Sequence, residues 1–326
     1  MQLFDDQIAE WKKLDVAPTR RDDFDAFWTE TLEKVEAGSL NVKGGRIDYL
    51  LPGMDVRDLT YEGLDGTEIS TWLLLPPEAK EAPVPCVVCY HGAGYYKSVP
   101  DQYNHWIANG VAAIAIDFRL QAGKTGCNSG FPSGNLMDGS FTLGLLDKHA
   151  FYGYHLWTDA LRALRLARET DEIDSERIGV SGGSQGGGCA LMMAALDPSV
   201  KVCLATVPSS CWFEKRLFDR SGGAGSMAEY LRRHPDYIEQ ACDTLSYFDN
   251  INLADRIQCP TMVSLGLKDP VCTPDAVYAA CNKIKAPLRM DAYPFATHDI
   301  CWENVREKEI NSFLKTFDWE REKDPP

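Results

Sequence analysis

A glycine-rich segment with a central serine, residues 177–190, restricts the possible folds of this chain more than any other segment. Ile178 and Val180 lie in a short apolar run that predicts a buried strand, and the apolar residues 189–193 predict a helix. Between them stands Gly-Gly-Ser-Gln-Gly, with Ser184 at its centre. A strand, a G-x-S-x-G sequence and a helix in direct succession are what a nucleophile elbow requires, because small neighbours let strand and helix approach while the hydroxyl stays exposed. The alternative is an ordinary glycine-rich loop, so other residues must supply a base, an acid and an oxyanion hole.

The segments around this sequence predict alternating strands and helices. We expect buried apolar strands at 84–90, 110–117, 178–180, 200–207, 261–266 and 288–293. Helical spacing of apolar residues predicts helices at 24–35, 154–168 and 299–317. Earlier in the chain, two antiparallel strands are expected at 56–61 and 68–75, joined by a turn at 63–66. Continuous apolar strands separated by helices indicate an α/β fold with a mostly parallel sheet covered on both faces.

Two segments interrupt this alternation. Residues 121–148 are rich in Gly, Ser and Asn and predict a long loop or hairpin, whereas 209–250 are polar with helical tendency and predict a small inserted cap. Loops of this length inside a compact domain are usually functional or involved in assembly. The sequence contains no repeat and no second core pattern. We therefore expect a single domain over 1–326, with a helical lead-in at 1–40.

Charge and cysteine usage restrict the partners and the compartment. The formal net charge of −15 argues against nucleic acid or an anionic membrane surface as a partner. No signal peptide is visible at the start, and no run reaches the roughly 18 apolar residues of a spanning helix. The eleven cysteines are an odd number, and several lie in apolar strand or helix patterns. A cytoplasmic location fits this usage best.

The order of further residues completes a catalytic triad with Ser184. A serine hydroxyl needs a general base, and His298 lies between the last expected strand and the final helix. Asp269 follows directly after the strand before it, where it is the only carboxylate. In an α/β-hydrolase fold the order along the chain is serine, acid, histidine. The sequence therefore predicts Ser184 as nucleophile, His298 as base and Asp269 as the acid that orients it.

Backbone N–H groups on either side of the serine predict an oxyanion hole. One donor normally follows the nucleophile, here Gln185, and the other comes from the loop after the early strand that ends in His-Gly, here Ala93. His91, beside this loop, is expected to have a structural role. We expect the substrate site to be lined by Tyr95, Ser209, Trp212 and Val271.

Two competing motifs do not predict a metal or cofactor site. Cys86 and Cys89 have metal-binding spacing, but they lie within one strand, where residues three apart face opposite sides of the sheet. No second Cys or His pair of zinc spacing accompanies them. The glycines around Ser184 are not followed by the Gly-Lys-Ser/Thr of a phosphate loop. We expect no metal and no cofactor.

Several motifs in register resemble the acetyl xylan esterase and cephalosporin-C deacetylase family, carbohydrate esterase family seven. The resemblance covers about residues 24–317 and rests on the glycine-rich serine motif together with the segments 143–147, 207–213, 245–252 and 266–269. It implies an α/β-hydrolase fold and a serine esterase that removes acetyl groups from small acetylated sugars through an acyl-enzyme. It further implies a cytoplasmic homo-oligomer, often a hexamer assembled through an insertion in the sheet.

The chain departs from the family pattern at four positions. The family's Arg-Gly-Gln has Leu120 in the middle, and its His-Glu ends in Asp299. Ala93 replaces a common tyrosine and Ser209 replaces a common aromatic residue, changes that would widen the pocket. A bulkier ester or a lactone is therefore an alternative substrate. A non-catalytic binding protein with the same fold is a third hypothesis.

Overall fold

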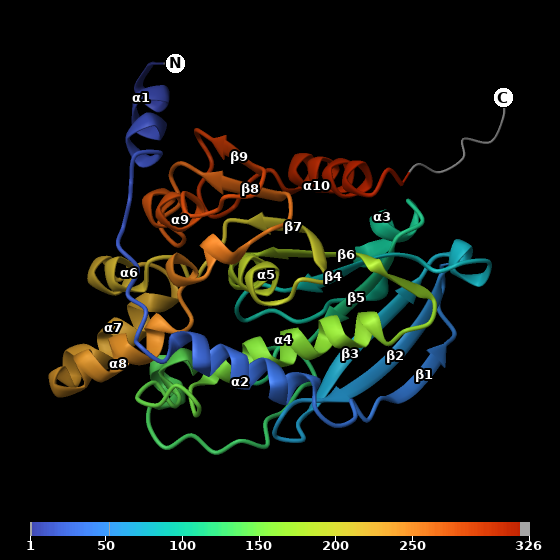
Figure 1. The fold of residues 1–326 in the computed structure, drawn as a ribbon, viewed down its shortest axis with the longest axis horizontal. Helices are drawn as coiled ribbons and strands as arrows, with labels where there is room; N and C mark the ends of the chain where they lie inside the picture. Colours follow the sequence, from blue (N-terminus) through green and yellow to red (C-terminus); the bar gives the residue numbers. More distant parts are fainter. Residues whose placement is uncertain (1, 52, 320–326) are drawn as a thin grey trace.

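The computed structural model describes residues 2–51 and 53–319, which build a nine-stranded sheet with helices on both faces (Figure 1). The order of the strands across the sheet is β1-β2-β3-β5-β4-β6-β7-β8-β9. Their bounds are Lys43–Ile47 (β1), Asp55–Glu62 (β2), Glu68–Leu75 (β3), Val84–Tyr90 (β4), Ala112–Ile116 (β5), Ile173–Gly183 (β6), Val200–Thr206 (β7), Thr261–Gly266 (β8) and Leu288–Tyr293 (β9).

The sheet is parallel over most of its width. Strands β5, β4, β6, β7, β8 and β9 pair in parallel, while β1, β2 and β3 pair antiparallel and join the parallel part where β3 meets β5. The prediction of an α/β-hydrolase fold with a mostly parallel sheet is confirmed. Since the carboxyl ends of parallel strands meet at one edge, the loops after β4, β6, β8 and β9 converge there, as ligand-binding loops do in open α/β sheets.

Strand β4 shows why the parallel strands are apolar throughout. All seven of its residues are buried, and its side chains alternate between two cores. Cys86 and Val88 face the core that contains α4 and α5, while Val87 and Cys89 face the core that contains α3 and α10. The two cysteines therefore lie on opposite faces of the sheet, and the expectation that they do not form a shared site agrees with this packing.

The helices follow the predicted pattern, and the structure adds α3 and α9, which the sequence analysis does not predict. The lead-in contains α1 in addition to the expected α2, and Figure 1 shows α1 projecting from the body of the molecule. The α-helices are Gln2–Trp11 (α1), Phe24–Glu36 (α2), Asn104–Ile107 (α3), Tyr152–Arg168 (α4), Gln185–Leu196 (α5), Phe213–Asp219 (α6), Gly223–Arg233 (α7), Ile238–Ser246 (α8), Pro274–Cys281 (α9) and Trp302–Thr316 (α10).

Both predicted insertions lie beside the functional edge of the sheet. Residues 121–148 form a long loop with two short 3₁₀ turns, Leu136–Asp138 and Ser140–Thr142, and residues 209–250 carry α6, α7 and α8. The loop and the cap contact each other through both of these turns and helix α7. Among the helices of residues 2–51 and 53–319, none combines the length and hydropathy needed to cross a bilayer.

Candidate active site

Ser184 occupies a strained turn between β6 and α5. Its backbone angles are φ 57° and ψ −115°, a conformation that residues with a side chain rarely adopt. The surrounding glycines are required by close packing: a Cβ atom on Gly186 would lie 1.9 Å from the carbonyl oxygen of Tyr90, and one on Gly182 would lie 2.3 Å from that of Gly186. This is the geometry of a nucleophile elbow, and it presents the hydroxyl at the carboxyl edge of the sheet.

Ser184, His298 and Asp269 form a hydrogen-bonded series in which the histidine lies between the other two. His298 Nε2 is 3.0 Å from Ser184 Oγ, and His298 Nδ1 is 2.8 Å from Asp269 Oδ2. Asp269 lies after β8 and His298 in the loop after β9. The backbone N–H groups of Val271 and Cys272 donate to Asp269 Oδ1 at 2.7 and 3.0 Å, which leaves Oδ2 for the histidine. The buried carboxylate thus holds the imidazole with Nε2 free to accept the serine proton.

The two predicted oxyanion donors lie on either side of Ser184. Gln185 is buried and begins helix α5, so that its backbone N–H is one of the donors that a helix start leaves unpaired. Ala93 is in the loop after β4, and both residues line a cavity that reaches Ser184. Their role as donors stays a prediction that this placement favours.

Gln121 connects the two sides of this oxyanion arrangement. The backbone N–H of Gly94 donates to Gln121 Oε1 at 2.8 Å, and Gln121 Nε2 donates to the Gln185 side chain at 3.0 Å and to the Tyr152 hydroxyl at 3.1 Å. One side chain therefore fixes the loop after β4 relative to the first turn of α5. The sequence signals this residue only as the last member of the Arg-Leu-Gln segment, without a role.

His91 has the structural role expected of it. Its Nε2 accepts the backbone N–H of Phe118 at 2.9 Å, so Nδ1 carries the proton and donates to the Gly92 carbonyl at 2.8 Å. Burial lowers the pKa of the imidazole, which favours this neutral form. Because both ring nitrogens are occupied, His91 supports the oxyanion loop and does not act as a base.

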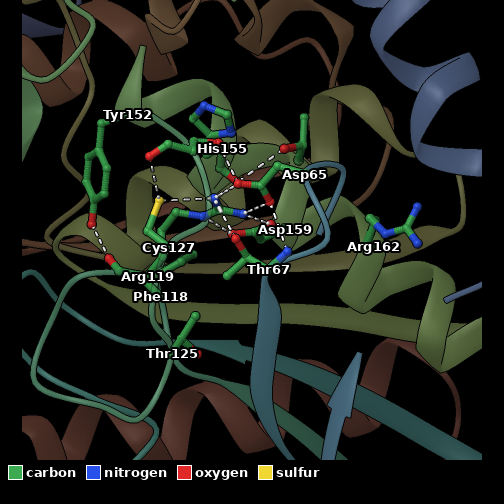
Figure 2. A network of polar contacts seen from close by, with 12 residues as sticks. Asp65, Thr67, Phe118, Arg119, Thr125, Cys127, Tyr152, His155, Asp159 and Arg162 are labelled. Atoms are coloured by element: carbon green, nitrogen blue, oxygen red, sulfur yellow. Dashed lines mark hydrogen bonds and ion pairs between the residues drawn. The ribbon is translucent and has the colours of Figure 1, made fainter. Parts of the chain in front are cut away.

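A buried ion-pair network surrounds Arg119, two residues before Gln121 in the chain, and Figure 2 shows this network. The Arg119 guanidinium is fully buried and donates to both oxygens of Asp159 at 2.8 Å and to Asp65 at 2.8 Å. Although burial opposes the charge, the two carboxylates raise the pKa of Arg119. The Tyr152 hydroxyl, which Gln121 also contacts, donates to the Arg119 carbonyl. The network thereby anchors the segment from which Gln121 reaches the active site.

A small cavity of about 100 Å³ opens beside Ser184 and is lined by residues of the cap, the long loop and the segment after β8. The predicted substrate residues Ser209 and Val271 belong to this lining, but Tyr95 and Trp212 do not. Tyr95 is 68% exposed, because the loop after β4 turns its ring outward. Phe213 takes the place expected for Trp212. The full lining is Ala93, Phe141, Ser184, Gln185, Ser209, Ser210, Phe213, Arg216, Gly223, Ala224, Met227, Val271 and Cys272.

One wall of the cavity is held in a strained conformation. Val207, Ser210 and Trp212 all have positive φ angles, of 41°, 53° and 54°. The buried carboxylate of Asp249 accepts the backbone N–H groups of Trp212 and Phe213 at 2.8 and 2.6 Å and thereby holds the end of this wall. Burial raises the pKa of Asp249 to about 6. Asp249 lies about 40 residues after this segment in the chain. The sequence analysis includes it in a family-like motif but does not predict that it holds the cavity wall.

The catalytic centre also contains a thiol. In the part of the chain that the structure describes, the only group of three or more residues able to hold a metal ion is Asp269, Cys272 and His298, with one ligand atom from each within 4.8 Å of the others. Cys272 is buried, which raises the pKa of its thiol to about 11. The ester chemistry of the triad does not require this thiol.

Comparisons with known proteins agree with the geometry. A curated relative, the acetyl esterase Axe7A of Xylanibacter ruminicola, is 29% identical over 285 residues, which make up 85% of this chain. The chain spans 63% of the length of that relative. A solved acetyl xylan esterase from Paenibacillus sp. R4 superposes with a TM-score of 0.89 at 32% identity and covers 94% of this chain and 98% of its own.

A second solved structure and a family model extend the same result. Acetyl xylan esterase 1 from Thermoanaerobacterium sp. JW/SL YS485 superposes with a TM-score of 0.88 at 25% identity, over 95% of this chain and 98% of its own. The family model described as acetyl xylan esterase matches residues 1–317. A match over nearly the whole chain, together with the triad geometry, shows that this chain belongs to the acetyl xylan esterase family.

Proposed function

We propose that the protein is a carboxylic ester hydrolase that removes acetyl groups from small acetylated carbohydrates through an acyl-enzyme. The observation that carries this proposal is the continuous hydrogen-bonded series from Asp269 through His298 to Ser184 Oγ, at 2.8 and 3.0 Å. Family membership supports the same chemistry.

In this proposal the geometry supports a separate part in the reaction for each residue of the triad. Ser184 Oγ attacks the ester carbonyl while His298 Nε2 takes its proton, and the same nitrogen then returns the proton to the leaving alcohol. Asp269 holds Nδ1 and stabilises the imidazolium as it forms. The negative charge on the tetrahedral intermediate would lie against the backbone N–H groups of Ala93 and Gln185, and one such donor is typically worth about 10²–10³ in rate. Water then attacks the acyl-enzyme by the same steps, which releases the acid and restores Ser184.

The cavity beside Ser184 favours a short acyl group. Its volume of about 100 Å³ is well below the roughly 300–1,000 Å³ of pockets that enclose whole drug-sized ligands. The aromatic rings of Phe141 and Phe213 and the side chain of Met227 line it, so that it offers mainly apolar contacts. We therefore place the acetyl methyl group in this cavity and prefer an acetyl ester to the bulkier acyl esters that the small side chains of Ala93 and Ser209 suggest.

The sugar would then lie on the open side of Ser184. Tyr95 and Phe295 are 68% and 76% exposed, and they belong to the loops that carry Ala93 and His298. Exposed aromatic rings provide apolar faces with polar edges, which suit the mixed surface of a sugar ring. In this proposal Tyr95 contacts the alcohol part of the substrate and not the acyl part.

The test compares Ser184→Ala with a matched control, Ser175→Ala. Ser175 is exposed and lies near the other end of the same strand, β6. Acetate release from p-nitrophenyl acetate and from acetylated xylose should fall about 10⁶-fold in kcat for Ser184→Ala and stay unchanged in the control. Acetyl, butyryl and feruloyl esters compared on the wild type define the acyl group. Near-normal turnover by Ser184→Ala would refute the triad assignment.

A fluorophosphonate probe separates the enzyme from a binding protein of the same fold. Such a probe should label Ser184 covalently in the wild-type protein, because the nucleophile must be activated by His298 for the reaction to occur. Failure to label a folded wild-type protein would favour the binding protein.

We also propose a homo-oligomer in a reducing compartment. All eleven cysteines are free thiols, which supports a reducing environment. Strand β1 lies at the edge of the sheet with mostly exposed side chains, and an open edge of this kind can pair with another copy. Light scattering of the purified protein measures the oligomeric state directly.

A further inference from the structure

The thiol of Cys272 lies against the reacting atoms without a part in the ester chemistry. Cys272 lines the cavity beside Ser184, and its sulfur lies within 4.8 Å of a ring nitrogen of His298. Ser184 Oγ is 3.0 Å from His298 Nε2, so a sulfur atom and an imidazole nitrogen both lie beside the serine hydroxyl. Both are groups that bind zinc and similar cations well, whereas magnesium and calcium prefer oxygen ligands.

The spacing of these groups is close to that of a metal site. With Zn–S bonds of about 2.3 Å and Zn–N bonds of about 2.0–2.1 Å, two ligands of a tetrahedral zinc lie about 3.5 Å apart. One ligand atom each from Asp269, Cys272 and His298 already lies within 4.8 Å of the others. Modest side-chain movements would therefore bring the sulfur and Nε2, the ring nitrogen that Asp269 does not hold, onto one cation.

Asp269 would support such a site without binding the cation itself. It holds His298 Nδ1 at 2.8 Å, and backbone N–H groups hold its other oxygen. Metal-binding histidines usually donate their second ring N–H to a carboxylate in this way, which fixes the ring and makes the other nitrogen a better ligand. The arrangement that directs Nε2 at Ser184 therefore also prepares it for a metal ion.

We propose that the catalytic centre is also an inhibitory site for a thiophilic divalent cation such as Zn²⁺, bound by Cys272 Sγ and His298 Nε2. Coordination replaces the thiol proton, which passes to solvent, and occupies the lone pair with which His298 accepts the serine proton. The cation enters through the cavity that Cys272 lines with Ser184. Catalysis stops because the base is engaged and the space next to Ser184 Oγ is filled.

The activity test measures hydrolysis of p-nitrophenyl acetate against buffered free Zn²⁺. The wild type should be inhibited reversibly, with activity restored by EDTA, while Mg²⁺ should not inhibit. Cys272→Ser and Cys272→Ala should each need at least tenfold more free Zn²⁺ for half-inhibition, relative to the activity of the same variant without metal. Cys301→Ser is the matched control, because Cys301 is exposed and follows His298 by three residues. Its inhibition should equal that of the wild type.

The activity test rests on the proposed esterase function. A direct binding measurement tests the metal site independently of that function. Cd²⁺ titrated into Ser184→Ala protein should produce thiolate-to-cadmium charge-transfer absorption in the ultraviolet. The same titration of the double variant Ser184→Ala, Cys272→Ser should lack that signal. The inference is overturned if Zn²⁺ does not inhibit the wild type, if the Cys272 variants are inhibited like the wild type, or if the cadmium signal survives in the double variant.

Discussion

Replacing Leu120 with glycine should stabilise the protein, although it removes a large apolar side chain. Leu120 has a φ angle of 56°, in the left-handed region that costs a residue with a Cβ atom about 1–2 kcal/mol. Its side chain is 38% exposed and belongs to none of the buried core clusters of the described residues. The conformation therefore explains why the family pattern has glycine here, between the anchored Arg119 and the active-site Gln121.

The magnitude follows from two opposing effects. Glycine removes the conformational cost of about 1–2 kcal/mol but increases the entropy of the unfolded chain, which costs about 0.5–1 kcal/mol. We expect Leu120→Gly to raise the free energy of unfolding by about 0.5–1 kcal/mol. Leu120→Ala is the control, because it removes the same side chain and keeps the strained backbone. It should be no more stable than the wild type.

Urea unfolding measures this difference. The midpoint should rise for Leu120→Gly at an unchanged slope, which indicates a change in stability and not in the extent of unfolding. Both variants should keep their rate of p-nitrophenyl acetate hydrolysis if Gln121 stays in place. A glycine variant that is no more stable than the alanine variant would refute the assignment of strain to this position.

Three further perturbations test the supports of the site. Gln121→Leu removes the side chain that accepts the Gly94 N–H and should lower kcat about 10²-fold, as the loss of an oxyanion donor does. The control, Gln240→Leu on the cap, should leave kcat unchanged. Equal kcat values for the two variants would contradict this role of Gln121. Arg119→Met leaves the buried Asp159 unpaired and should cost about 3–5 kcal/mol in unfolding free energy, so a loss below 1 kcal/mol would argue against the network. Asp249 has a folded-state pKa of about 6 against about 3.9 when unfolded, so the folded state binds its proton more tightly and stability falls as pH rises from about 4 to 6. In Asp249→Asn the decrease in unfolding free energy over this pH range should be smaller by up to about 3 kcal/mol. If unfolding free energy depends on pH in the same way in both proteins, Asp249 does not cause the decrease.

Local patterns in the sequence predict those structural features that are set by residues close together in the chain. The continuous apolar strands predict a parallel sheet because both of its faces are covered, and β4 with its alternating side chains shows this directly. The glycines around Ser184 predict the elbow because the close approach of Gly186 to Tyr90 excludes a Cβ atom. The positions of Asp269 and His298 follow from the strand ends, since parallel strands deliver their loops to one edge.

The contacts between distant segments could not be predicted in this way. The sequence predicts Tyr95 and Trp212 as substrate-binding residues, but neither lines the cavity beside Ser184, where Phe213 lies instead and from which the exposed Tyr95 ring is absent. The direction of a side chain in a loop depends on backbone angles and on remote hydrogen bonds, such as those from Trp212 and Phe213 to Asp249. Periodicity carries no information about either.

The amino-acid sequence alone predicts the α/β order of elements, the elbow at Ser184 and the residues of the hydrogen-bonded series from Asp269 through His298 to Ser184. These follow from local sterics and from one topological rule for parallel sheets. The packing of the loops brings Gln121 between the two sides of the oxyanion arrangement and places Cys272 in the same cavity as Ser184. The physical reason is that these contacts join residues about 30 to 90 positions apart, and their geometry is set by how the loops pack against each other at the edge of the sheet.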